Sequence, residues 1–314
     1  MSSLQQTSSD FMHCQLFYVN EAQQAQIASL QALVVKHQLP IILNIELFSE
    51  KLNQKRRQQL SQYSIQPILV LDEKNKLSWL SDGLSVAPEW DKLQRRVVSA
   101  GRKSELLLQA AKITADSTVI DATAGFGHDS LILASTGAQV IMLEHQPLIA
   151  LLLLAEQQRM STLPNWQKLM RRLQIINTDA LSYFESIDFT DSSNGLTANS
   201  HQTIDVVYLD PMFPEDSYQD SKTGKGAKVG KHMQALHQLA RPPTLEEESQ
   251  LLQSAQAIVS QNASQGRVVV KRPQLAHYLR INNQAKAGIM KRYVLMGISF
   301  KKPFVTMHGV SLNF

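Results

Sequence analysis

From about residue 89 onward, short apolar runs alternate with longer helical stretches. Predicted strands fall near 118–122, 139–143, 173–177, 204–209 and 267–270, and predicted helices cover 103–112, 129–135 and 147–160 and start again at Thr244. Alternation at this spacing predicts a mostly parallel sheet with helices on both faces. Two closing strands, near 293–300 and 304–310, are separated by too few residues for a parallel crossover, so we expect them to pair antiparallel.

The first 87 residues have a different pattern and predict a separate unit. Apolar runs at 15–19, 41–45, 67–71 and 77–80 flank a glutamine-rich helical stretch over 21–37. Asp82-Gly83 and Pro88 are turn signals that mark its end. We therefore expect a small N-terminal α/β domain over 1–87 and a larger α/β domain over 88–314.

Composition narrows the class of protein. With 314 residues, 43% hydrophobic and 18% charged, the chain can bury a large core, which excludes disorder as its main state. The longest apolar run, Leu148–Ala155, is about half of a membrane span, and the N-terminus lacks the basic and apolar pattern of a secretory signal. A single cysteine, Cys14, and histidines without metal-ligand spacing predict neither a disulfide nor a metal site. The cytoplasm is the expected compartment.

Charge is unevenly distributed along the chain. The net charge is +4, yet no acidic residue follows Glu248, while nine lysines and arginines do. Such asymmetry favours a polyanionic partner, most commonly nucleic acid, and the alternative is a solvated basic face.

The segment Val119–Ser130 reads VIDATAGFGHDS and carries the most information. An apolar strand runs into a Gly125-x-Gly127 turn, where the missing Cβ lets the backbone approach a ligand, and a helix follows. A dinucleotide fingerprint would need a third glycine where Ser130 stands. Asp121 would repel phosphate but can accept hydrogen bonds from a cationic amino acid moiety. The turn alone is equally compatible with an ordinary strand-to-helix connection.

Four consecutive predicted strands each end in a carboxylate. The second ends at Glu144, where an acceptor for two ribose hydroxyls is required in nucleotide-binding α/β folds, and the third ends at Asp179, which can accept from an adenine amino group. The fourth ends at Asp210, in the sequence Asp-Pro-Met-Phe-Pro. One acid there could be a helix cap. Four acids at the ligand edge of a parallel sheet indicate a binding site.

These motifs resemble the Rossmann-like S-adenosylmethionine-dependent methyltransferases. The Asp210-Pro-Met-Phe turn is similar to the Asn/Asp-Pro-Pro-aromatic motif of enzymes that methylate exocyclic amino nitrogens, with Met212 in place of the second proline. Together with Val268–Pro273, the motifs resemble, over residues 89–310, the bacterial enzymes that methylate N2 of a guanine in 16S ribosomal RNA. His128 departs from that family, where an arginine is expected.

The resemblance implies a seven-stranded, mostly parallel Rossmann-like sheet with a C-terminal antiparallel hairpin, and S-adenosylmethionine as the cofactor. It assigns to the cofactor site Asp121, Gly125, Gly127, His128, Asp129, Glu144, His145, Asp179, Ala180 and Asp210.

The chemistry that the resemblance implies is positioning rather than strong base catalysis. The amino lone pair of guanine is delocalised, whereas a sulfonium methyl is already activated. Asp210 and the carbonyl of Pro211 would accept the two N2 hydrogens, and Phe213 would stack on the base. Without its neighbours, Phe213 would be interpreted as a core aromatic.

Basic residues near this turn are expected to contact 16S ribosomal RNA or the small ribosomal subunit. Glycines among them oppose a helix, so a flexible basic loop is predicted over the first four, and the last two end the fifth strand. The alternatives are a solvated loop and a surface charge. The candidate RNA contacts are Lys222, Lys225, Lys228, Lys231, Lys271 and Arg272.

Two other functions remain open at this point. One is methylation of another amino target, such as adenine N6 in DNA or a protein glutamine, although the basic residues favour nucleic acid. The other is a non-catalytic RNA-binding or assembly protein that keeps only the fold, against which the four strand-end carboxylates argue.

Overall fold

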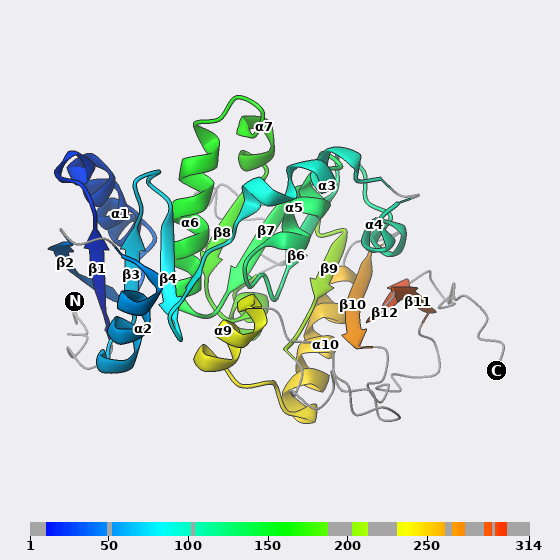
Figure 1. The fold of residues 1–314 in the computed structure, drawn as a ribbon. Coiled ribbons are helices and arrows are strands. Elements are labelled where there is room, and N and C mark those ends of the chain that lie inside the picture. The colour runs from blue at the N-terminus through cyan, green and yellow to red at the C-terminus, as the bar shows by residue number, and fades with distance from the viewer. Residues whose placement is uncertain are drawn as a thin grey trace, which may run out of the picture.

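The computed structural model describes residues 11–48, 52–101, 104–187, 203–212, 231–260, 266–273, 286–290 and 293–299. Two sheets lie on either side of helix α6 (Pro147–Ser161), which contacts β4 of the first sheet and β7 and β8 of the second (Figure 1). None of the helices in this described part of the chain is long and apolar enough to cross a membrane.

The first sheet has the strand order β2-β1-β3-β4-β5, with β1 parallel to β2 and β3 and the last two pairings antiparallel. Its elements are β1 (Met12–Tyr18), α1 (Gln24–Lys36), β2 (Ile41–Leu47), α2 (Gln54–Tyr63), β3 (Ile68–Leu71), β4 (Leu77–Ser81) and β5 (Leu84–Val86). The four predicted strands and the glutamine-rich helix are present. Helix α2 was not predicted, because its sequence QKRRQQLSQY has no apolar period; Asn53 caps it by accepting from the Arg56 N–H at 2.9 Å.

The second sheet has the strand order β11-β12-β10-β9-β6-β7-β8. Its strands are β6 (Thr118–Asp121), β7 (Gln139–Glu144), β8 (Leu173–Asn177), β9 (Val206–Leu209), β10 (Arg267–Pro273), β11 (Lys286–Met290) and β12 (Tyr293–Ser299). The first five are parallel. The chain adds strands outward on one side of β6 and then returns to its other side with β9. Ligands of open α/β sheets bind at such a reversal.

The antiparallel end of this sheet differs in detail from the prediction. Strand β12 coincides with the predicted strand at 293–300, but it pairs with β10 and with β11. The sequence KAGIM of β11 has a central glycine and no alternation, so it was not predicted as a strand. Residues 304–310, the predicted partner, lie outside the described residues.

The second sheet separates two layers of apolar side chains. Val119, Met142 and Tyr208 belong to one core cluster, whereas their strand neighbours Ile120 and Leu143 belong to another. This alternation is the period of two expected for strands buried on both faces. Helices on the first face are α4 (Leu106–Ala111), α5 (His128–Ala134) and α6, and those on the second are α8 (Ala180–Ser186) and α10 (Leu245–Ser260). The first cluster continues into the core of the first sheet.

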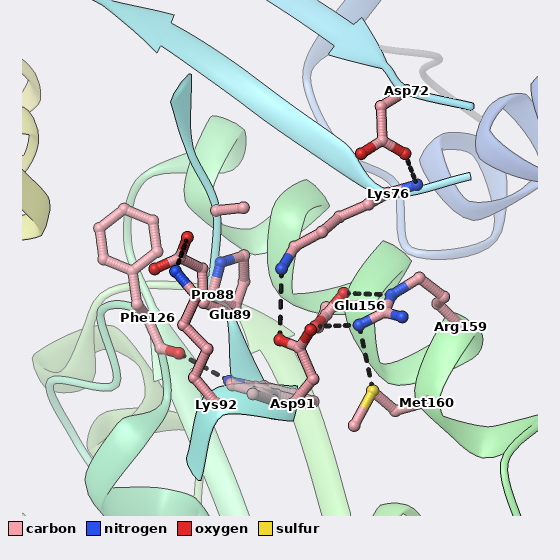
Figure 2. Close-up of polar contacts among 12 residues, drawn as sticks. Asp72, Lys76, Pro88, Glu89, Asp91, Lys92, Phe126, Glu156, Arg159 and Met160 are labelled. Atoms are coloured by element: carbon pink, nitrogen blue, oxygen red, sulfur yellow. Dashed lines mark hydrogen bonds and ion pairs between the residues drawn. The ribbon is translucent and has the colours of Figure 1, made fainter. Parts of the chain in front are cut away.

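A short connection ties the first sheet to the second. Trp90, in a 3₁₀ turn over Trp90–Leu93, is fully buried, and its indole N–H donates to the carbonyl oxygen of Phe126 at 2.8 Å. In the same turn, Asp91 pairs with Lys76, which directly precedes β4, at 3.3 Å (Figure 2). The Gly125-x-Gly127 turn is therefore fixed from the side of the first sheet.

The remaining helices are α3 (Gln94–Ser99), α7 (Gln167–Met170) and α9 (Lys231–Leu239).

Replacing Trp90 by Phe tests this connection. The change leaves the Phe126 carbonyl without its buried donor, and we expect the free energy of unfolding to fall by about 1–3 kcal/mol more than in Trp166→Phe. Trp166 is also buried but precedes α7, away from the turn. Urea denaturation followed by circular dichroism measures both variants. Equal losses would show that the hydrogen bond does not hold the turn.

Candidate active site

The two glycines of the β6–α5 turn have different structural roles. Both have left-handed backbones, with φ of +52° at Gly125 and +73° at Gly127. A Cβ on Gly127 would lie 2.6 Å from Met142 Cε and 3.1 Å from Trp90 Cζ2, whereas one on Gly125 would meet Leu236 Cδ1 at 3.6 Å. Gly127 is thus required by core packing as well as by conformation, and Gly125 mainly by conformation.

Asp121, at the end of β6, makes hydrogen bonds to residues on both sides of the Gly125-x-Gly127 turn. Its carboxylate is 1% exposed and accepts from the Ser130 hydroxyl at 2.5 Å and from the Thr123 N–H at 3.2 Å. Burial raises the pKa of Asp121 to about 7, and the Ser130 hydrogen bond opposes that rise. Ser130, which stands where a dinucleotide site needs glycine, is therefore the partner of a buried acid.

Glu144, at the end of β7, links the second strand to the turn. One carboxylate oxygen accepts from the Gly125 N–H at 2.9 Å, and the other accepts from the Gln146 N–H at 2.7 Å. Burial raises the pKa of Glu144 to about 7. Each carboxylate oxygen can accept a further hydrogen bond, so the predicted role in holding two ribose hydroxyls is compatible with these contacts.

The end of β8 lies next to Glu144. The Asn177 side-chain amide donates to the carbonyl oxygens of Glu144 and His145 at 2.7 and 3.1 Å. Asp179 caps α8 by accepting from the Ser182 N–H at 2.9 Å, and the hydrogen bonds from Ser182 outweigh burial and lower the pKa of Asp179. Ala180 packs in the core cluster of the second face. The helix-cap alternative thus applies to Asp179, and its contact with adenine stays a prediction.

Asp210 belongs to a network of ion pairs and hydrogen bonds that the sequence did not predict. Lys271 Nζ lies 2.7 Å from Asp210 Oδ2 and 2.9 Å from Asp129 Oδ2. The Tyr208 hydroxyl donates to the same Asp129 oxygen at 2.6 Å, and the Asp210 N–H donates to Thr123 Oγ1 at 2.6 Å. The first turn of α5 and the ends of β9 and β10 therefore meet at one point. Tyr208 and Thr123 were missed, although Tyr208 lies two residues before Asp210 on the same strand face.

The charges of this network are mutually dependent. Burial raises the pKa of Asp210, the Asp129 charge adds to that rise, and the Lys271 ammonium opposes it. For Asp129, Lys271 and the Tyr208 hydrogen bond outweigh burial and lower the pKa. Burial would lower the pKa of Lys271, but the two carboxylates outweigh it and raise that pKa. One ammonium thus serves two carboxylates.

His128, the departure from the related family, faces the connection between the sheets. Its Nε2 lies 2.7 Å from the Pro88 carbonyl oxygen, and burial lowers the pKa of the imidazole. His232 of α9 approaches the Ala87 carbonyl in the same way at 2.8 Å, and the two rings are 5.1 Å apart. Both imidazoles therefore bind main-chain carbonyls. Among the described residues, no group of three or more metal-binding side chains occurs.

The predicted RNA contacts are placed only in part. Lys231 is the first residue of α9, so it belongs to a helix rather than to the predicted loop; the glycines that oppose a helix all precede it. Pro211 is buried beside Asp210, and Arg272 lies in β10 next to Lys271. Lys222, Lys225, Lys228 and Phe213 lie outside the described residues.

The residues of this edge suit one kind of ligand. Carboxylates at the ends of four neighbouring strands attract cationic groups and accept from hydroxyls and amines, and they repel phosphate. S-adenosylmethionine offers a sulfonium, an ammonium and two ribose hydroxyls and carries no phosphate. These hydrogen-bond acceptors fit S-adenosylmethionine, and Asp121, Glu144 and Asp179 are the residues that would hold it.

Comparison with known proteins agrees with this chemistry. A family model described as "Putative SAM-dependent methyltransferase" matches residues 49–294. The chain is 77% identical over 277 residues to "Ribosomal RNA small subunit methyltransferase J" of Psychrobacter cryohalolentis, covering 88% of this chain and 92% of that protein. Identity to the protein of that name from Psychrobacter arcticus is 74% over 280 residues, covering 89% and 93%. A SAM-dependent methyltransferase structure from Neisseria gonorrhoeae superposes with a TM-score of 0.60 at 23% identity, covering 90% and 94%, which shows a shared fold.

Fold, site and family together define a Rossmann-like methyltransferase that uses S-adenosylmethionine as its cofactor. Within that class, the chain belongs to the ribosomal RNA small subunit methyltransferase J family.

Cofactor affinity should depend on pH through the buried acids. Because burial raises the pKa of Glu144 and Asp121 to about 7, both lose their charge as the pH falls from 8 to 6. We expect the affinity for S-adenosylmethionine to fall over this range, by at most about tenfold per pH unit for each group. Glu144→Gln should weaken that dependence without abolishing it, since Asp121 still titrates.

Calorimetric titration at pH 6, 7 and 8 measures this effect, and comparing variants at each pH cancels the titration of the ligand's own amino group. Glu144→Ala should weaken binding by about 1–3 kcal/mol at pH 8. Glu185→Ala, at an exposed position on α8, is the matched control. Unchanged affinity in Glu144→Ala would place the ribose contact elsewhere.

Proposed function

We propose that the protein transfers the methyl group of S-adenosylmethionine to the exocyclic N2 of a guanine in 16S ribosomal RNA. The observation that carries this proposal is Asp210, a carboxylate at the end of β9 beside the β6 turn, ion-paired through one oxygen. It is followed by Pro211-Met-Phe, which resembles the motif of amino methyltransferases. The names of the relatives support small-subunit ribosomal RNA as the substrate.

In this mechanism the chain positions an amine. The bound cofactor supplies an electrophilic methyl carbon. Asp210 and the Pro211 carbonyl accept hydrogen bonds from the two N2 hydrogens, which restores lone-pair density on nitrogen and orients it. The bound cofactor would supply its methyl group to this nitrogen and leave as S-adenosylhomocysteine, and one N2 proton would pass to solvent. The Asp210 charge stabilises the positive character that develops on the amine.

We further infer how the rest of the chain serves this reaction. Residues 1–87 form the small N-terminal domain, and residues 88–314 form the methyltransferase domain with its seven-stranded sheet. The basic side chains between Lys222 and Lys231 contact the RNA backbone, and Phe213 stacks on the target base. The enzyme acts in the cytoplasm, on the RNA itself or on a partly assembled small subunit.

Asp210 variants test the catalytic proposal. Asp210→Asn keeps an acceptor oxygen but loses the charge, and we expect methyl transfer to slow by roughly 10–1000-fold with a far smaller change in cofactor affinity. Asp210→Ala should be slower still. The measurement is single-turnover transfer of labelled methyl to the small subunit, with mass analysis of the product nucleoside for N2-methylguanosine.

Asp116→Asn, an exposed acid-to-amide change, is the control. Near-normal turnover in both Asp210 variants would refute this role. A loss of cofactor affinity equal to the loss of rate would make Asp210 a binding residue instead.

The basic segment has its own test. Replacing Lys222, Lys225, Lys228 and Lys231 together by Ala should weaken RNA binding and flatten its salt dependence, because neutralised phosphates release counterions. Cofactor affinity should not change. Fluorescence anisotropy with a 16S fragment at several salt concentrations measures the slope, and an unaltered slope would mean that the segment is only solvated.

A further inference from the structure

Strand register places a lysine directly beside the proposed catalytic carboxylate. Strands β9 and β10 are parallel neighbours (Figure 1), with Leu209 opposite Val270. The next residues, Asp210 and Lys271, therefore adjoin each other at the edge of the sheet. Tyr208 precedes Asp210 by two residues and therefore lies on the same face. The register of the two strands therefore places the Asp210, Lys271 and Tyr208 side chains near one another.

The surroundings of Lys271 differ from those of a phosphate-binding lysine. Its side chain is 18% exposed, and its ammonium contacts Asp129 and Asp210 through one oxygen of each. The two carboxylates next to it would repel a phosphate brought to the same ammonium. The described contacts of Lys271 are therefore those of an ion-pair partner for Asp129 and Asp210 and not those of a phosphate-binding residue.

We propose that Lys271 is a positioning residue for methyl transfer, which holds Asp210 Oδ2 so that Oδ1 is left to accept from the target amine. Asp129 and Tyr208 hold the ammonium in turn. This proposal rests on the proposed function, because it assigns to Asp210 the task of presenting the amine.

The need for such a residue follows from the charges around Asp210. Burial and the Asp129 charge both favour its protonated form, and a protonated carboxyl is a poorer acceptor that carries no charge. The charged and titratable groups of the described residues around this network come from five elements. They are Asp121 from β6, His128 and Asp129 from α5, Tyr208 from β9, Lys271 from β10 and, from α3, Arg96, which pairs with Glu105 at 2.9 Å. Arg96 acts on Asp129, whereas Lys271 is the cation that opposes the rise in the pKa of Asp210.

Lys271→Met removes the charge and keeps most of the side-chain length. Asp210 should then ionise only at higher pH, so the single-turnover rate should fall by tenfold or more at pH 7 and recover in large part by pH 9. The affinity for a 16S fragment and its salt slope should be unchanged. Lys168→Met, at an exposed position on α7, is the control for loss of one positive charge.

A phosphate contact would give the opposite pattern. RNA affinity would weaken, the salt slope would fall by about one, and the shape of the pH–rate profile would stay as in the wild type. That result would overturn the proposal. An equal loss of rate at every pH would also overturn it, since it would show no effect on the ionisation of Asp210.

Two further variants guard against a protein that merely folds poorly. Lys271→Arg should restore part of the rate at pH 7. Tyr208→Phe removes one hydrogen bond to Asp129 and so favours its protonated form, which weakens the negative charge beside Asp210. The pH profile should then shift slightly to lower pH, opposite to the shift expected for Lys271→Met. Cofactor affinity measured in parallel reports folding. If Lys271→Arg restores none of the rate and Tyr208→Phe leaves the pH profile unchanged, the positioning role is wrong. If Asp210→Asn also keeps the wild-type rate, the proposed function of Asp210 itself fails, which separates the two failures.

Discussion

Carboxylates that are buried or partly buried at one edge of a parallel sheet are the constraint on which the site depends. A carboxylate removed from water loses several kcal/mol of solvation unless hydrogen bonds or a counter-ion replace the water. Each acid here is compensated differently: Asp121 by Ser130 and a backbone N–H, Glu144 by two backbone N–H groups, Asp179 by the N-terminus of α8, and Asp210 by Lys271. The same hydrogen bonds and ion pair also fix the loops at the strand ends. The contacts that stabilise the carboxylates therefore also determine the shape of the site.

The reversal of strand order brings those contacts within reach of one another. Because β9 adds to the free side of β6, the end of β9 adjoins the glycine turn, and the Asp210 N–H reaches Thr123. On the other side of β6, Glu144 reaches Gly125. The turn is thus held by both neighbouring strands, while Trp90 holds it from the connection to the first sheet. A loop fixed on three sides can keep its acceptors oriented before a ligand arrives, which is the condition for electrostatic preorganisation.

The periodicity of apolar residues was sufficient to predict most strands of the second sheet. It was not sufficient to predict helix α2, strand β11 or the contacts between strand ends. The strands ending at Asp121, Glu144 and Asp210 could be predicted because buried parallel strands are continuous apolar runs that stop at polar residues. Helix α2 lacks an apolar face, and β11 is short and contains glycine, so neither leaves such a pattern. The pairing of Lys271 with Asp210 depends on register between strands 61 residues apart. Sequence spacing carries no information about that register, so Lys271 was interpreted as an RNA contact.

The sign of the charge at this edge also bears on how a polyanion can be a substrate. The carboxylates that suit a sulfonium and an amine repel phosphate, so the RNA backbone must be held away from them while a base enters. Nine basic residues and no acid follow Glu248, so the part of the chain that carries β10 has a net positive charge, and the proposed function assigns to it attraction for that backbone. Lys271 belongs to that set, and its ammonium pairs with Asp129 and Asp210. A base has no charge and brings amino hydrogens that carboxylates accept. Under the proposed function, the acidic edge would therefore discriminate between the parts of a nucleotide by the same charges that orient the amine.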